Sequence, residues 1–156
     1  MPRIYTISSK FVTIAAAQDI FGLKGSSGKI CRLRALLFAM NDTTLQTAQG
    51  LRFNVKYGSA TVTLGSGGSS PTPRPLDPGD AAASFTAVAN ATTPSTTSGA
   101  FVDITPAGGH NYAGFKYRWF DNFPIFGLNT GIVFELNSTV SGTCNFSGFA
   151  EVEEIG

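Results

Sequence analysis

Apolar and polar residues alternate with a period of two through much of this chain. Residues 51–57 read Leu-Arg-Phe-Asn-Val-Lys-Tyr, so every second side chain is apolar. On a helix these apolar side chains would scatter around the axis, whereas on a strand they form one dry face opposite a wet face. Residues 113–119 and 132–137 repeat the pattern. The alternation therefore predicts half-buried β-strands.

Seven further segments have the apolar, β-branched or aromatic character of strands: 4–7, 11–14, 20–23, 30–40, 60–64, 101–105 and 143–152. The second half of 30–40 is continuously apolar, which fits a strand buried on both faces or a short helix, and the adjacent Gly/Ser turn favours the strand. Turn-forming residues separate the segments at the spacing of sandwiches and barrels. We therefore expect one all-β domain over 1–156, with about eight to ten strands in a two-sheet β-sandwich and a jelly roll as its topology.

One short helix is expected after a Pro-rich loop. Asp80 precedes the run 81–88, which is rich in alanine, and its carboxylate can accept a hydrogen bond from the free N–H groups of a first helical turn. A second loop is expected at 90–99, because this stretch is rich in Thr and Ser. We expect it to be exposed.

The Gly/Pro-rich stretch at 65–80 precedes that helix. It begins with flexible Gly and Ser and becomes stiff, because alternating prolines favour an extended path. It is either a solvated surface loop or an arm that docks on a neighbouring subunit at little further entropic cost. The candidate contact residues of the arm are Pro71, Pro73, Arg74, Pro75, Leu76 and Pro78. If the stretch is an arm, deletion of residues 69–78 would leave the β circular-dichroism signal intact and weaken assembly.

Charge and hydropathy exclude several classes of partner. Charged residues make up 13% of the chain and the net charge is +1, so no global field attracts nucleic acid or an anionic membrane. We expect neither as a partner. No apolar leader is visible at the start and no run of about 18 apolar residues occurs, so we expect a protein made in a host cytoplasm. A weakly charged surface also favours self-association.

The residues that carry catalysis or bind metals are scarce, and we expect no enzyme, no cofactor and no metal. His110 is the one histidine, and it lies in a Gly-rich turn with no nucleophile motif. Cys31 and Cys144 lack the spacing of a zinc site and are expected to be buried as small hydrophobic residues. By alternation, Cys31 shares a face with Leu33, Ala35 and Leu37. The acidic cluster Glu151, Glu153 and Glu154 is expected to be solvated charge on an edge strand.

Aromatic residues gather at 112–120. Tyr112, Tyr117, Trp119 and Phe120 could form a stacking platform for a sugar or a base. Tyr117 and Trp119, however, fall on the apolar side of their strand, which favours a core or a subunit interface. Tyr112 and Trp119 are therefore candidate contact residues beside those of the arm.

The stretch 72–80 and the C-terminal stretch 140–156 carry a family resemblance. In architecture and composition across its length, the chain resembles the jelly-roll cement or decoration proteins on the capsids of tailed bacteriophages. This resemblance implies a virion protein that forms a homo-oligomer, a dimer or a trimer, and binds where subunits of the major capsid protein or other virion proteins meet. Two alternatives stay open: a self-assembling capsid or tube subunit, and a carbohydrate-binding module or receptor-binding head.

Overall fold

The structure is a computed structural model that describes residues 2–42, 46–110 and 114–156. This part of the chain forms β-strands and contains no helix, which confirms the all-β expectation. The strands, in chain order, are β1 (Arg3–Ile14), β2 (Gln18–Gly25), β3 (Ile30–Met40), β4 (Gly50–Gly58), β5 (Val62–Thr63), β6 (Arg74–Pro75), β7 (Phe85–Ala91), β8 (Thr96–Thr97), β9 (Phe101–His110), β10 (Phe115–Arg118), β11 (Ile125–Phe126), β12 (Gly131–Leu136) and β13 (Cys144–Ile155).

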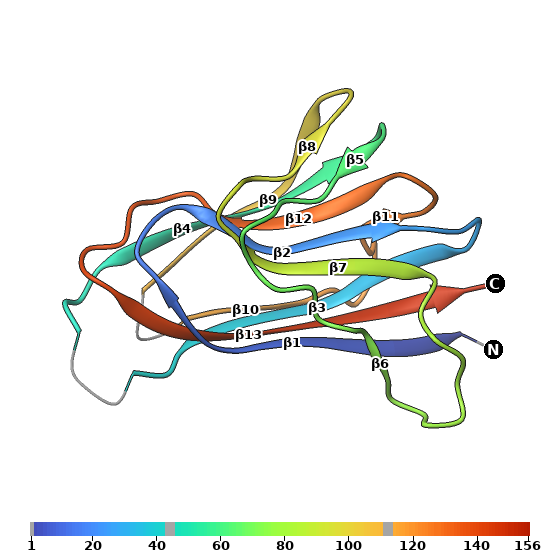
Figure 1. Ribbon diagram of the computed structural model, residues 1–156, viewed down its shortest axis with the longest axis horizontal. Coiled ribbons are helices and arrows are strands. Elements are labelled where there is room, and N and C mark those ends of the chain that lie inside the picture. The colour runs from blue at the N-terminus through green and yellow to red at the C-terminus, as the bar shows by residue number, and fades with distance from the viewer. Residues whose placement is uncertain (1, 43–45, 111–113) are drawn as a thin grey trace.

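Two antiparallel sheets face one another as a sandwich (Figure 1). Sheet A has the order β10-β3-β13-β1-β6, and β11 also pairs with β3. Sheet B has the order β7-β2-β12-β4-β9. A separate pair, β5 and β8, lies beyond sheet B. The first long strand therefore pairs with the last one, so the domain closes through contacts that are distant in sequence.

Aromatic side chains from both sheets fill the core. Phe38 of β3 stacks on Phe146 of β13 with a ring-centroid distance of 4.5 Å, and it meets Phe53 of β4 edge-on at 5.4 Å. Phe53 in turn stacks on Phe134 of β12 at 5.5 Å. Because aromatic pairs add to the stabilisation from burial alone, this cluster joins the two sheets.

A β-bulge in β3 changes which side chains face the core. Val152 of β13 pairs with Leu33, and the preceding Glu151 pairs with Ala35, so Arg34 is an extra residue. The inward positions are therefore Leu33 before the bulge and Leu36 after it, while Leu37 is 38% exposed. The expectation that Ala35 and Leu37 share the buried face of Cys31 is wrong, because one inserted residue reverses the alternation.

The expected helix at 81–88 is also wrong. From Phe85 onward the chain is strand β7, which pairs with β2. Phe85, Ala87 and Ala89 are buried while Thr86 between them is exposed, so this segment has a period of two despite its alanines. Hydrogen bonding to β2 and burial of the phenylalanine ring outweigh the weak helix propensity. Asp80 forms an ion pair with Arg3, with 3.4 Å between Oδ1 and Nε.

The stretch 90–99 is exposed only in part. Asn90, Ala91 and Ser95 are buried, and Thr96–Thr97 pairs with β5. The Ser95 N–H donates to the Asp19 carboxylate at 2.6 Å, and burial raises the pKa of Asp19. A Cβ built on Gly22 of β2 would lie 3.1 Å from Leu64 and 3.3 Å from Ser95. This segment therefore covers part of the outer face of sheet B.

Candidate functional site

Three of the four sheet edges are partly covered or short. The edge at β1 is paired with β6, and the edge at β7 is bridged by Ser69. The edge at β10 spans four residues. The remaining edge strand, β9, contains Pro106, which has no N–H to donate to a neighbouring strand. Edge-to-edge pairing with another chain is thus disfavoured.

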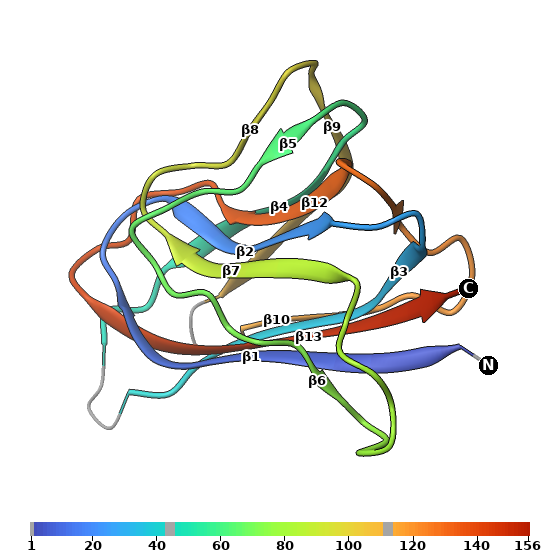
Figure 2. The same cartoon turned by 45° about the vertical axis from the view of Figure 1, so that its right-hand side comes forward.

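The strap, defined as residues 65–76, crosses the open side of the sandwich from sheet B to sheet A (Figure 2). Ser69 exchanges two backbone hydrogen bonds with Ala89 of β7, at 2.9 and 2.8 Å. Further along, β6 pairs with β1, and the Leu76 N–H donates to the Ile4 carbonyl at 2.9 Å. The stretch proposed as an arm therefore binds its own domain.

The strap determines how accessible the arm residues are. Pro71 and Pro73 are half-buried and line a groove against β7, and Pro75 is half-buried in β6. The exposed candidates are Arg74, Leu76 and Pro78. Contact of these residues with a neighbouring subunit stays a prediction.

Stiffness of the strap is expected to contribute to stability. Replacing Pro71, Pro73 and Pro75 by serine should lower the free energy of unfolding by about 1–2 kcal/mol, because each proline restricts the unfolded chain. The β circular-dichroism signal should persist. Urea titration measures the change, and Pro94→Ser in the exposed part of 92–94 is the control. An unchanged midpoint would mean that these three prolines do not stabilise the domain.

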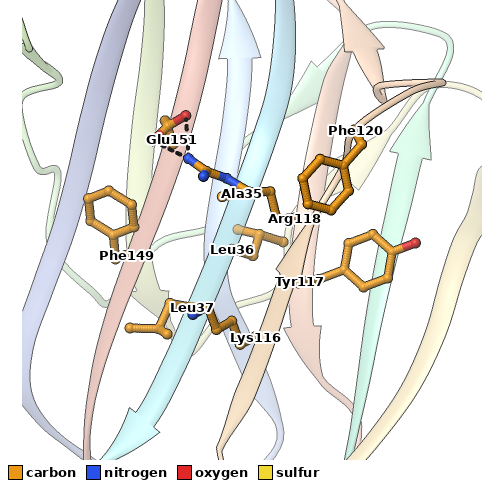
Figure 3. A pocket seen from close by; sticks show the side chains of 9 residues that line it. All are labelled: Ala35, Leu36, Leu37, Lys116, Tyr117, Arg118, Phe120, Phe149 and Glu151. Atoms are coloured by element: carbon orange, nitrogen blue, oxygen red, sulfur yellow. Dashed lines mark hydrogen bonds and ion pairs between the residues drawn. The ribbon is translucent and has the colours of Figure 1, made fainter.

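The outer face of sheet A is the open face of the molecule: within the described residues, no segment crosses its centre. Cross-strand pairing places Ser8, Phe149, Leu37 and Lys116 in one row across β1, β13, β3 and β10. Figure 3 shows this region, where Phe149 and Leu37 lie side by side. The site is thus a sheet surface with apolar side chains at its middle.

Two shallow hollows meet at this row. One has a volume of about 460 Å³, and its aromatic margin includes Tyr117 and Phe120, which is 81% exposed. The other has a volume of about 490 Å³ and extends over Ser147 toward Lys10. Leu37 and Phe149 line both hollows, so the two form one continuous apolar groove across the sheet.

A charged bridge crosses the groove beside the apolar row. Arg118 of β10 reaches over β3 to Glu151 of β13, with 3.4 Å from the guanidinium nitrogen to each carboxylate oxygen (Figure 3). Arg34 approaches the same carboxylate at 3.3 Å. Because β13 lies between β1 and β3, the expectation that the acidic cluster is solvated charge on an edge strand is wrong. Glu154 of this cluster points inward and is buried.

The aromatic candidates separate into buried and exposed members. Trp119 is 7% exposed and belongs to the core, so little of its ring is available to a ligand. It lies against Tyr117, with ring centroids 4.5 Å apart. Tyr112 lies outside the described residues. The signal that sequence reasoning missed is Phe149, an apolar residue on the polar side of an otherwise alternating strand.

The two cysteines lie in separate strands, Cys31 in β3 and Cys144 in β13. Cys31 and Cys144 are buried and free, as expected, and burial raises the pKa of the Cys31 thiol to about 11. Over 2–42, 46–110 and 114–156, no group of three His, Cys, Asp or Glu side chains is placed to hold a metal. The side chain of His110 lies outside the described part. Within it, no helix is long and apolar enough to cross a membrane.

Comparison with known proteins finds little. No family model and no curated protein matches the sequence. A solved chain described as "Structure of infectious bursal disease virus Gx strain" shares 15% identity and a TM-score of 0.16. The comparison covers 99% of this chain and 41% of that chain. Similarity this weak supports neither a fold nor a function.

Proposed function

We propose that this protein is a non-catalytic structural subunit of a virion, a decoration or cement protein that stabilises a phage capsid through its outer surface. The observation that carries the proposal is the apolar groove around Leu37 and Phe149 on the open face of sheet A. An exposed apolar groove on a rigid sheet is suited to protein packing. Copies of the protein and the subunits of the shell are the partners of such a surface.

We also propose that the sandwich is a jelly roll. Eight strands, β1 to β4, β9, β10, β12 and β13, support this topology. Numbered from one to eight along the chain, they follow the order 1-8-3-6 in sheet A and 2-7-4-5 in sheet B, an order that supports a jelly roll. The other five strands, β5, β6, β7, β8 and β11, are additions to it. Jelly rolls occur in viral capsid proteins and in lectins, so the topology favours the proposal without deciding the function.

The energetics of shell reinforcement fit this surface. Stable association requires an interface of about 1,600 Å², and repetition over a lattice adds avidity without any reactive group. The protected edges limit growth by strand addition, which would otherwise form fibres. Contact through a face of the sheet does not extend a sheet from one copy to the next.

A carbohydrate-binding module is the second candidate. Exposed Phe120 and Tyr117 lie in one hollow beside Arg118, an arrangement that can stack against a sugar ring. Glycan-array binding that disappears in Phe120→Ala would favour this function over the structural role.

Leu37→Asp tests the structural role directly. The substitution is expected to abolish binding of the protein to its shell, measured by co-sedimentation with shells that lack this protein. A carboxylate at the centre of an apolar contact would be buried without a partner. The β circular-dichroism signal should persist, because Leu37 lies outside the core.

Val102→Asp is the matched control. Val102 is an exposed apolar residue in β9 of sheet B, 58% exposed, so its replacement should leave association unchanged. A wild-type protein that stays strictly monomeric at high concentration and binds no shell would contradict the structural role.

A further inference from the structure

The outward-facing charges of sheet A are mostly positive. Its strands carry six cations and two anions on this face, a net charge of +4, and the whole chain carries +1, so the remainder carries −3. The cations are Lys10, Arg32, Arg34, Arg74, Lys116 and Arg118, and the anions are Glu151 and Glu153. One further anion, Asp121, lies beside Arg32 at the opposite end from Lys116. The outer face of sheet A is therefore more positive than the chain as a whole.

The free cations flank the apolar groove. Lys10 borders one hollow and Lys116 borders the other, on either side of Leu37 and Phe149. Both lysines are exposed, and neither has an ion-pair partner among the described residues. At this end of sheet A the apolar surface thus lies between two unneutralised ammonium groups. Such a rim attracts carboxylates.

We infer that the outer face of sheet A binds an acidic surface of a different protein, and not the same face of a second copy. The inference rests on the proposed function and names the partner chemistry of its site. Two copies packed face to face would bring like charges together around the apolar row, which disfavours that contact. An acidic partner with an apolar patch would instead satisfy Lys10 and Lys116 at the rim and cover Leu37 and Phe149 at the centre.

Phe120 provides an anchor for this contact. Its side chain is 81% exposed at the margin of the groove, next to Tyr117. Aromatic residues that fill a partner pocket contribute a large share of binding energy, and the surrounding polar rim excludes water. The groove and its anchor together match the centre and margin of a protein–protein contact.

The same charges are poorly arranged for nucleic acid. Two arginines of the face, Arg34 and Arg118, are already occupied by Glu151. The other cations are spread over both ends of the sheet and surround apolar side chains. Phosphate backbones are held by several neutralising contacts along one track, and this face offers none. A carboxylate-bearing protein surface is the better match.

The test uses the full-length protein and a labelled random copolymer of glutamate and tyrosine, which presents carboxylates together with apolar rings. In fluorescence anisotropy, binding is expected to weaken as NaCl rises from about 50 to about 300 mM, because salt screens exposed charges. The double variant Lys10→Glu/Lys116→Glu should bind about tenfold more weakly or worse. Lys24→Glu/Arg52→Glu changes the net charge equally on sheet B and should stay within about twofold of the wild type.

Four results would contradict the inference. Equal losses of affinity for the copolymer in both double variants would show that only the net charge matters. If the wild type does not bind the copolymer, the face does not bind an acidic partner. Equal or tighter binding to a labelled DNA duplex or to phosphatidylserine vesicles would assign the face to another class of partner. If sedimentation velocity shows that Lys10→Glu/Lys116→Glu changes self-association, the face joins copies, and the structural role still stands. That role fails separately if Leu37→Asp leaves binding to the shell intact.

Discussion

Replacing Phe38 by alanine is expected to lower the free energy of unfolding by about 3–5 kcal/mol. The ring is 1% exposed and lies against Phe53, Phe134 and Phe146, so its removal breaks contacts to both sheets. The cavity would form at the centre of the sandwich, where close-packed strands relax little. Urea unfolding followed by circular dichroism and fluorescence measures the change.

Leu37→Ala is the matched control, because it removes a similar apolar group from the next residue of the same strand. Leu37 is on the outer face, so the cost is expected to stay below about 1 kcal/mol. The pair of variants also tests the bulge at Arg34. If Leu37→Ala cost more than Phe38→Ala, the uninterrupted alternation would be correct and the bulge would be absent.

The second large effect is expected at Glu154, whose side chain is 1% exposed. Its carboxylate accepts hydrogen bonds from the backbone N–H and the hydroxyl of Ser84, and it binds the Lys29 ammonium at 2.8 Å. Arg3 lies 3.9 Å away. This one group therefore connects the end of β13 to the start of β3 and to the segment before β7.

Glu154→Gln is expected to lower the free energy of unfolding by about 2–3 kcal/mol at neutral pH, because it removes the charge that neutralises Lys29 within a buried network. Chemical denaturation measures the loss. Glu153→Gln is the control: this neighbour faces outward and takes part in none of the observed ion pairs of the described chain, so its change should stay within about 0.5 kcal/mol. Equal effects of the two substitutions would show that the buried network adds nothing.

The stabilisation by Glu154 should depend on pH in one direction. Burial by itself would raise the pKa of this carboxyl, but the hydrogen bonds from Lys29 and Ser84 outweigh it, and the pKa lies below its ordinary value of 4.5. The folded state thus holds the proton more weakly than the unfolded state. The contribution is complete above pH 4.5 and is lost as the pH falls through the folded pKa. Asp19, whose pKa is raised by burial, has the opposite effect on stability. It is present in both the wild type and Glu154→Gln, so its effect cancels when the stabilities of the two proteins are compared at each pH.

Local alternation predicted most strands because the pleat itself has a period of two. Residues 51–57 became β4, and the ambiguous segment 30–40 became β3. The same reasoning failed at 81–88, where the composition favours a helix and pairing with β2 produces a strand. A preference of a few tenths of a kcal/mol per residue is smaller than the gain from a paired, buried strand.

The candidate site was less accessible to sequence reasoning than the fold. Proline spacing identified the strap, but not that it binds its own domain at Ala89 and Ile4. The sequence does not predict the groove, because alternation places Leu37 in the core and makes Trp119 a candidate contact, whereas the structure buries Trp119 and exposes Leu37. An inserted residue leaves no mark in a single sequence, because its effect depends on the register with a partner strand.

The sequence by itself determined that this protein is built from strands with one dry face, since the alternation of side chains is a property of neighbouring residues. Only the tertiary structure decided which strands are neighbours, where β3 reverses its faces, and which sheet surface stays open. Those features follow from pairing between residues such as Glu151 and Ala35, more than a hundred positions apart, and no local pattern encodes the energy of such a contact.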